Sequence, residues 1–401
     1  MDGFKTGLLR RSARRNVALC WYAGLALAAR PLVSLAEIDL TPYATGSYEY
    51  QSNPFYQWSG SPARAAESSD SVVTLRAGMD ARLLVSRQSL VATAEIRRFD
   101  YRDLTFLGRT EGTFDGAYQW ALTSLVNGAV DYRHERRMVP FDELADTREL
   151  LMETEDTGTA SVNLTSRQGW RLENRVKVRN LASPRPGVPD LNLHETSLHE
   201  AVRRLVKTLS VGLDGEYLSG SYNGAGQLGT PRYHQTTLQF AGERKIVGFS
   251  TFECAFGYTR RDDAIGAGVS ALTGLVGYQR ELSSKTSVEA LLTRAVNSYV
   301  TAAGSEIDTG LALRVVWRPT AKIQVTPGFS VVRSAFPGQT FESQSSRHDR
   351  YRVAALDVRY QVLDWLSLHP YARRALRSSN VAAFGFNASA VGLELAFKES
   401  K

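Results

Sequence analysis

Hydrophobic and polar residues alternate with a period of two along most of this chain. The segment from Trp170 to Asn180 shows the pattern clearly, because one parity is mainly apolar and the other holds arginine, lysine and glutamate. Successive side chains of a β-strand point to opposite faces, so the segment predicts a strand with one apolar wall and one charged wall. Similar units of roughly ten residues recur between turn signals. We predict about eighteen strands, with sixteen as the alternative count.

The connections between these strands alternate in length. Long polar stretches lie at 51–69, 135–156 and 334–349, whereas the turns at 86–89 and 165–169 are short. Outer-membrane barrels combine short periplasmic turns with long outer loops. The rhythm therefore predicts an all-β fold, a transmembrane antiparallel β-barrel in the outer membrane of a Gram-negative bacterium. A soluble sandwich or propeller would also have alternating strands, but it does not account for the long-short rhythm.

Two further patterns agree with a membrane barrel. No apolar stretch after residue 36 is long enough for a transmembrane helix, so the predicted strands must carry the membrane contact. Large aromatic residues lie near the predicted strand ends, where the girdles of a barrel contact the membrane interfaces; they are Trp120, Trp170, Trp317, Trp365 and Phe397.

The first 36 residues have the pattern of a secretory signal. A basic region with Lys5 and four arginines precedes an apolar stretch, and small residues lead up to Ala36. This predicts a signal peptide at 1–36 and a barrel at 37–401, with a short membrane anchor as the alternative. The whole sequence has a net charge of +7, but residues 1–36 carry six basic residues and one acid, so the remainder is near +2. Such a balanced charge argues against nucleic acid as a partner.

The charged parity is predicted to line an aqueous lumen, because about sixteen to eighteen strands enclose a channel. Both signs occur there, and one strand carries a basic ladder that would guide an acidic polymer. The alternative is that lumen charges pair with one another and serve only the wall. The predicted channel-lining residues are Arg76, Asp80, Arg82, Arg97, Arg133, Arg171, Glu173, Arg175, Lys177, Arg179 and Arg314.

The loop 135–156 carries an amphipathic stretch from Pro140 to Met152. Apolar residues recur there at roughly helical spacing, and the loop is rich in acids. We expect a short helix that either folds into the channel as a constriction or packs over the outer rim. The residues predicted to form this constriction are Phe141, Asp142, Glu143, Asp146 and Glu149.

Signals for catalysis are poor. The six histidines have no zinc-type spacing, and no nucleophile turn of the hydrolase kind is present. The glycine-rich run at 224–229 lies in a predicted loop with no helix after it, so it does not predict a phosphate cradle. The sequence predicts no enzyme, no catalytic residues, no cofactor and no metal site.

Several segments resemble the EpsL-type outer-membrane proteins of exopolysaccharide biosynthesis, which are associated with exosortase systems. The resemblance covers most of the chain after residue 36 and consists of strand-and-turn patterns, in the segments 68–78, 87–94, 99–102, 118–120, 155–162 and 169–172. It implies a barrel that passes a polysaccharide, made by a Wzx/Wzy-type pathway, out of the cell. The implied partners are the exopolysaccharide chain, outer-membrane lipid and a periplasmic export or co-polymerase protein. The alternatives are a general or small-solute porin and an adhesive surface barrel.

Overall fold

The computed structural model describes residues 37–61, 69–144, 148–184, 191–223, 231–246, 250–263, 268–299, 304–340 and 346–398. The predicted signal peptide at 1–36 lies outside them. Within these ranges the chain forms one antiparallel sheet of eighteen strands. The strands are β1 (Glu37–Gln51), β2 (Asp70–Val85), β3 (Gln88–Tyr101), β4 (Arg109–Ala121), β5 (Val126–Met138), β6 (Met152–Thr165), β7 (Trp170–Ala182), β8 (Asn192–Val206), β9 (Leu209–Asn223), β10 (Arg232–Ile246), β11 (Ser250–Asp263), β12 (Val269–Ser283), β13 (Thr286–Tyr299), β14 (Gly304–Trp317), β15 (Ile323–Thr340), β16 (Ser346–Leu363), β17 (Leu366–Ser379) and β18 (Phe386–Lys398).

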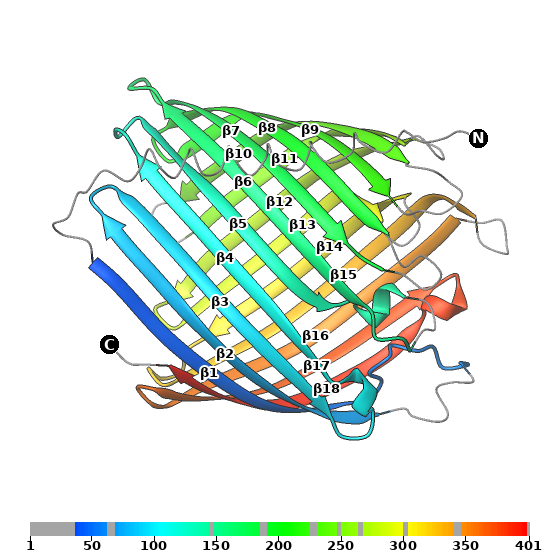
Figure 1. Ribbon diagram of the computed structural model, residues 1–401. Helices are drawn as coiled ribbons and strands as arrows, with labels where there is room; N and C mark the ends of the chain where they lie inside the picture. Colours follow the sequence, from blue (N-terminus) through cyan, green and yellow to red (C-terminus); the bar gives the residue numbers. More distant parts are fainter. Residues whose placement is uncertain are drawn as a thin grey trace, which may run out of the picture.

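The sheet closes on itself as a barrel (Figure 1). Each strand pairs with its neighbours in sequence, and β1 pairs with both β2 and β18. Closure leaves no sheet edge at membrane depth, which is the condition for a β-structure to cross a bilayer. The predicted all-β barrel is confirmed, and the strand count is eighteen.

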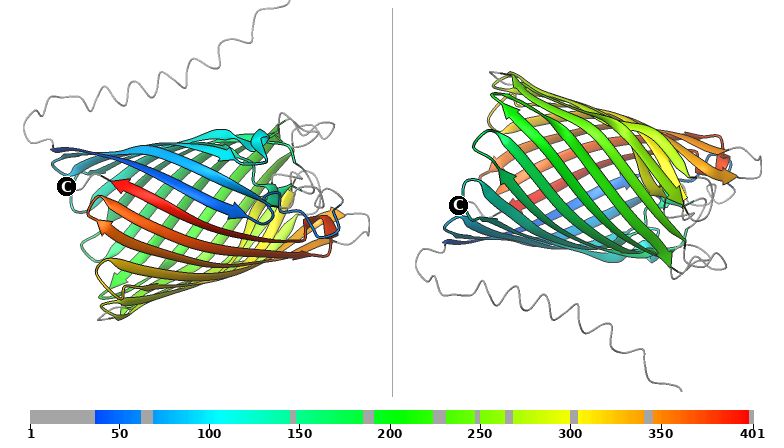
Figure 2. Two further views of the ribbon diagram at one scale, coloured as in Figure 1. Left: turned by 90° about the horizontal axis from the view of Figure 1, so that it is seen from below. Right: turned by 90° about the horizontal axis from the view of Figure 1, so that it is seen from above.

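The two ends of the barrel differ. The start of β1 and the end of β18 lie at the end with the short turns, and the three 3-10 turns lie at the other end (Figure 1 and Figure 2). One short turn depends on Gly169, whose φ of 84° is left-handed, and a Cβ there would approach the Leu205 carbonyl oxygen to 2.7 Å. The end with the short turns is the periplasmic one by the rule for outer-membrane barrels. We call the other the outer end.

The outer surface is a belt of apolar side chains. Leu75, Leu238, Phe256 and Leu272 are among many that are more than half exposed in the isolated chain. Exposure of this extent in a monomer marks a surface that is covered by something else, here lipid. Trp170, Trp317 and Phe397 are exposed at the periplasmic ends of their strands, and Trp365 is exposed in the turn just before β17, where a girdle was expected. No helix in the described ranges is long and apolar enough to cross a membrane.

The strands are longer at the outer end than the sequence predicted. The loop expected at 135–156 is shorter, because β5 continues to Met138 and β6 begins at Met152. Likewise β16 begins at Ser346, inside the loop expected at 334–349. The ladder of backbone hydrogen bonds does not depend on side-chain polarity, so it continues above the membrane where the side chains turn polar. Polar composition was therefore wrongly interpreted as loop.

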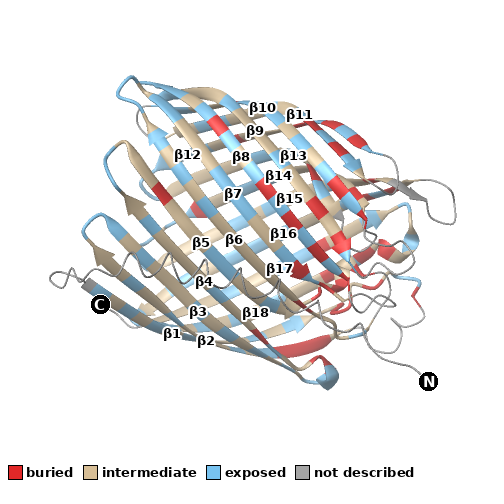
Figure 3. Ribbon diagram, turned by 45° about the horizontal axis from the view of Figure 1, so that its top comes forward, coloured by how far each residue is buried: buried red, intermediate tan, exposed pale blue. Residues whose placement is uncertain are grey.

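Buried residues gather at the outer end (Figure 3). One reason is that the outer end of the β13–β14 hairpin leaves the cylinder. The ladder between β12 and β13 stops at the pair Gly274 and Arg294, although both strands continue. Beyond it, Val296 and Ile307 pack against Val269 and Ala271, which lie near the outer end of β12.

Candidate functional site: a closed outer mouth above a charged lumen

The charged parity faces the lumen, and charges of opposite sign meet there across strands. The Glu95 carboxylate on β3 forms ion pairs with Arg76 from β2 at 3.6 Å and with Arg97 from its own strand at 3.1 Å. The Tyr43 hydroxyl donates to the same carboxylate at 2.8 Å. The predicted lining residues Arg76 and Arg97 are thus brought together, and an acid lies between them.

The predicted basic ladder lies on β7 and consists of Arg171, Arg175, Lys177 and Arg179. The surroundings of these side chains change along the strand. Arg171, near the periplasmic end, pairs with Glu173 at 2.8 Å. Arg175 and Lys177, in the middle, are exposed and form no ion pair or hydrogen bond with any described residue. Arg179, near the outer end, lies between two carboxylates. On β7, positive charge without an acidic partner is therefore found only at mid-height.

The remaining predicted lining residues are separate from one another. Asp80 accepts a hydrogen bond from Thr93 at 2.9 Å and lies 3.8 Å from the Lys398 ammonium. Arg82 is exposed near the periplasmic end of β2. Arg133 pairs with Glu135 at 3.1 Å, and Arg314 lies 3.8 Å from Glu289 with more than half of its side chain exposed.

The β5–β6 connection folds across the outer mouth. Phe141 is 2% exposed and lies in a cluster with Phe55, Leu104 and Leu107, which come from the β1–β2 and β3–β4 connections. Its ring meets that of Phe55 edge to face at a centroid distance of 5.0 Å. Three outer connections are thus held together by one small apolar core.

The helix predicted for this connection is not formed in its described part. A single 3-10 turn spans Phe141–Glu143, residues 148–150 have no regular structure, and β6 begins at Met152. A helix of this length is marginal by itself, and the contacts of Phe141 with the rim favour the turn. Glu149 is exposed, and Asp146 lies outside the described residues.

The same connection reaches the opposite wall of the mouth. Arg377 on β17 donates hydrogen bonds to the Asp142 backbone carbonyl and to the Asp349 carboxylate on β16. Burial raises the pKa of the Asp142 carboxyl above its usual range, although the cations Arg377 and Arg373 act in the opposite direction. The β5–β6 connection therefore touches both the rim cluster and β17, so it bridges part of the mouth.

The bent β13–β14 hairpin blocks a second part of the mouth. Ser298, near its tip, donates to the Glu195 carboxylate on β8 at 2.7 Å, and it lies 2.9 Å from the Tyr233 hydroxyl on β10. Arg261 on β11 donates to the Ser298 hydroxyl at 2.9 Å and to the Gly304 carbonyl at 3.2 Å. One serine therefore connects the hairpin with three strands of the facing wall.

Glu195 is the central acceptor of this anchor. It takes hydrogen bonds from Tyr233, Ser298 and Arg179, and Arg179 also pairs with Glu155 at 2.8 Å. The residue is only 8% exposed. A buried carboxylate with three donors is stabilised in its charged form, whereas the loss of one partner leaves a buried charge less compensated.

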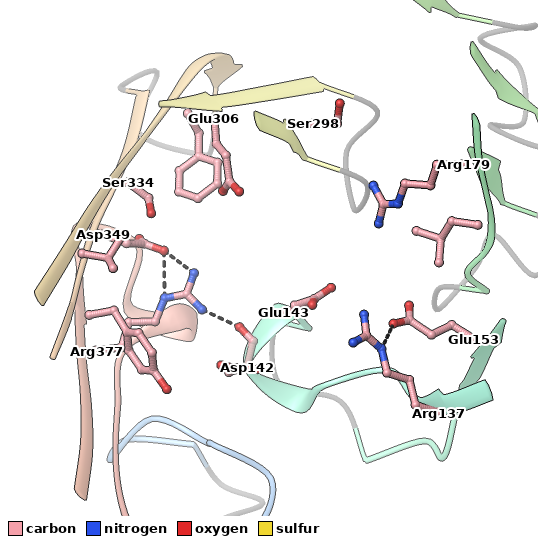
Figure 4. Close-up of a pocket in the computed structure, with 14 residues that line it drawn as sticks. Arg137, Asp142, Glu143, Glu153, Arg179, Ser298, Glu306, Ser334, Asp349 and Arg377 are labelled. Atoms are coloured by element: carbon pink, nitrogen blue, oxygen red, sulfur yellow. Dashed lines mark hydrogen bonds and ion pairs between the residues drawn. The ribbon is translucent and has the colours of Figure 1, made fainter. Parts of the chain in front are cut away.

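A cavity of about 310 Å³ remains between the two blocking segments (Figure 4). The side chains of Asp142 and Glu143 lie between Arg377 on one wall and Arg137 on the other. Further lining residues are Glu153, Arg179, Ser298, Glu306, Ser334, Asp349 and Tyr351. Charged side chains of both signs line the cavity together with the apolar Leu181, Val332 and Phe336, a mixture that suits a ligand with hydroxyl and carboxyl groups on an apolar frame. Among the described residues, no three His, Cys, Asp or Glu gather as metal ligands would.

The sequence pattern did not indicate Glu195, Tyr233, Ser298 or Arg377 as site residues. Their contacts join segments far apart in the chain, which a strand pattern does not reveal. One signal was available for the pair Arg347 and Asp349, whose side chains meet at 2.5 Å. The alternation of charge at i and i+2 continues the lumen-facing parity of β16 into the stretch that was predicted as a loop.

No family model and no curated protein matches this chain. Among solved structures, the fold is similar to the copper transporter OprC, with a TM-score of 0.50 and 11% identity over 87% of this chain. The chain spans 62% of the length of that protein. It is also similar to OccK9 (OpdG) of Pseudomonas aeruginosa, with a TM-score of 0.50, 13% identity, and coverage of 90% of this chain and 98% of that one.

At such low identity these similarities establish the fold and nothing finer. The fold is a transmembrane barrel of the kind found in the Gram-negative outer membrane, and the predicted location there is confirmed. No specific family is identified.

Proposed function

We propose that this protein is a gated outer-membrane channel through which an exopolysaccharide leaves the cell. The observation that carries the proposal is the contrast between a charged lumen and an outer mouth that is narrowed by two docked segments, the β5–β6 connection and the β13–β14 hairpin. Both segments are held by side-chain contacts that can be broken without unfolding the barrel ladder. A permeant that displaces these contacts would open the path.

The nature of the permeant is inferred from the lumen and from the resemblance to the EpsL-type family. A polysaccharide offers many hydroxyl groups and, in acidic polymers, carboxylates. The exposed Arg175 and Lys177 would attract such a chain, and the alternating acids and bases of the wall would exchange hydrogen bonds with it as it moves. The same wall would hold no single sugar tightly, which favours transit over storage.

A small-solute porin is the alternative. The cavity at the mouth, about 310 Å³, is at the lower end of the range of small-ligand sites, roughly 300–1,000 Å³. A general porin needs an open path, and the two segments docked across the outer mouth argue against a permanently wide one. A gate that opens for a delivered polymer also implies a periplasmic partner, an export or co-polymerase protein, that presents the chain to the open periplasmic end.

The test measures surface polysaccharide in a strain that lacks the protein. In parallel, the exclusion of a large antibiotic reports whether the outer membrane is intact. We expect loss of surface polymer with an intact membrane, and recovery when the wild-type gene is restored. Normal polymer together with slowed uptake of small solutes would replace the proposal by the porin. Normal polymer and normal uptake would contradict both.

A matched pair of variants sharpens the test. Arg175→Gln with Lys177→Gln removes the exposed charge of β7, whereas Arg171→Gln removes a charge that Glu173 already compensates. If an acidic polymer passes along this wall, the double variant should export less of it than the control at equal amounts of folded barrel.

A further inference from the structure

The outer wall of the barrel carries a row of cations just above the lipid-facing belt. Outward residues of five consecutive strands lie in one cross-strand register, in the order Arg294 on β13, Thr309 on β14, Arg333 on β15, Arg350 on β16 and Ser378 on β17. We call these five residues the outer arginine row. All three arginines are exposed.

The membrane boundary lies directly below this row. On the same strands, Leu292, Leu311, Phe329 and Leu356 face outward two to six residues nearer the periplasmic end and are 40–47% exposed. Outward side chains thus change from apolar to cationic within one to three steps of two residues, roughly 7 Å per step on one face of a strand, and on β16 the outward Arg352 already lies within this interval. We expect the head groups of the outer leaflet to meet the barrel near this change.

Two arginines of the row oppose each other without a compensating acid. Arg333 and Arg350 are direct cross-strand partners, a position in which like charges are destabilising. Neither guanidinium makes an ion pair or hydrogen bond with a described residue, and no outward position of β13 to β17 in the described ranges holds Asp or Glu. In the lumen, by contrast, the facing arginines Arg76 and Arg97 share Glu95.

Only some of the outward cations elsewhere on the outer end are compensated. Arg98 pairs with Asp100 at 2.9 Å, and Arg260 pairs with Asp262 at 3.1 Å. Arg136 on β5 and Arg232 on β10 also face outward without an ion pair or hydrogen bond to a described residue, and the row differs from them by the direct cross-strand pairing of Arg333 with Arg350. The row is a local excess of positive charge on one side.

The row also borders a groove. A depression of about 540 Å³ on this wall is lined by all five residues of the row, by His348 and Asn380, and by Asp349, whose carboxylate is paired with Arg347 and Arg377. It lies beside the point where the β13–β14 hairpin bends inward, and Arg294 spans that point by donating to the Leu272 carbonyl at 3.0 Å and to Thr309 at 2.7 Å. The site thus combines guanidinium groups with hydroxyl and amide donors around a hollow.

We propose that the outer arginine row binds the phosphate groups of the phosphorylated glycolipid of the outer leaflet. Guanidinium groups match phosphate oxygens with paired hydrogen bonds, and basic pockets at the membrane interface bind anionic head groups. A phosphate between Arg333 and Arg350 would remove the repulsion that the protein alone leaves. The bound lipid would sit against the hinge of the β13–β14 hairpin, on the outer side of the gate.

The experiment measures lipid bound to the purified full chain in detergent by native mass spectrometry, with diphosphoryl lipid A as the probe. The dephosphorylated lipid A and inorganic phosphate are tested at the same concentrations. The site variant is Arg333→Gln with Arg350→Gln. The control variant is Arg98→Gln with Arg260→Gln, which removes two outward arginines that already have acids.

We expect diphosphoryl lipid A to bind the wild type and the control alike, and to bind the site variant at least about tenfold more weakly, as loss of a charge-assisted hydrogen bond predicts. Arg333→Lys with Arg350→Lys, which keeps the charge, should bind with intermediate affinity. Equal binding by the site variant overturns the proposal, and so does equal loss in the control. Strong binding of inorganic phosphate, or of the dephosphorylated lipid, would also overturn it. Unchanged thermal unfolding of both variants shows that the barrels are folded.

Discussion

Two arginines on β7, Arg175 and Arg179, show that charged side chains have different surroundings at mid-height and at the outer end of the lumen. Arg179 at the outer end is about a quarter exposed and lies between Glu155 and Glu195, whereas Arg175 is exposed and has no partner among the described residues. Both belong to the same charged parity. The difference comes from the segments that cover the outer end, which remove water and make every charge there depend on a protein partner.

The lumen thus has two parts. In the outer mouth, charged side chains are largely buried against protein partners. In the rest of the lumen, from mid-height to the periplasmic end, they are exposed, and we call this part the vestibule. Removing one partner of a buried charge pair costs about 3–5 kcal/mol, but an exposed pair contributes about 0–1 kcal/mol. Substitutions of the same chemical kind should therefore open or loosen the mouth and leave the vestibule almost unchanged. The predictions below test this difference from the largest expected effect to the smallest.

The largest effect is expected for Phe141→Ala. Loss of this buried ring should weaken docking of the β5–β6 connection by about 3–5 kcal/mol, which shifts the docked population by two orders of magnitude or more. Single-channel conductance in planar bilayers should rise, with longer open times. The control is Phe106→Ala, since that ring is 52% exposed and stacks on Phe55 from outside at 6.2 Å. Equal conductance in wild type and Phe141→Ala would mean that this connection does not close the path.

Glu195→Gln should have the next largest effect. The amide keeps the shape but loses the charge that Arg179 and the Ser298 hydroxyl contact, at a cost of about 1.5–3 kcal/mol for a charge-assisted hydrogen bond. The β13–β14 hairpin should leave the lumen more often, which hydrogen exchange of the 295–299 amides would detect. Glu289→Gln is the matched change in the vestibule, and its exchange should equal the wild type. Equal hydrogen exchange of these amides in Glu195→Gln and Glu289→Gln would contradict the predicted difference between the mouth and the vestibule.

A smaller effect is expected from pH. Burial raises the pKa of Asp142 in the docked connection, so the docked state holds its proton more tightly than the undocked state. Docking is therefore strongest below the ordinary aspartate pKa and weakens as pH rises through the raised value. Conductance should increase over that window, and Asp142→Asn should abolish the increase because the amide does not titrate. An Asn variant with the wild-type pH profile would assign the dependence to another group.

The barrel could be derived from the sequence because each strand carries its own two-residue period, and the period survives whatever the strand packs against. The closed mouth could not be derived in the same way. Ser298 and Glu195 are 103 residues apart, and no local pattern records that they meet. The same limit explains the wrong helix, since the spacing around Phe141 is helical but its position is set by Phe55 from another connection.

The smallest change in stability is expected for Arg175→Gln with Lys177→Gln, a double variant that also tests whether the vestibule wall controls ion selectivity. Neither side chain has a partner among the described residues, so the unfolding midpoint in urea should move by an amount equivalent to no more than about 0.5 kcal/mol. The ion selectivity of the channel should nevertheless shift toward cations, because two positive charges leave the lumen wall. Arg171→Gln, next to Glu173, should shift it in the same direction by less, since its charge is already compensated. The ion selectivity is measured by the reversal potential in a salt gradient. Unchanged selectivity in the double variant would mean that permeating ions do not pass along β7. The part of the vestibule wall that sets selectivity would then lie on the strands around Arg133 and Arg314.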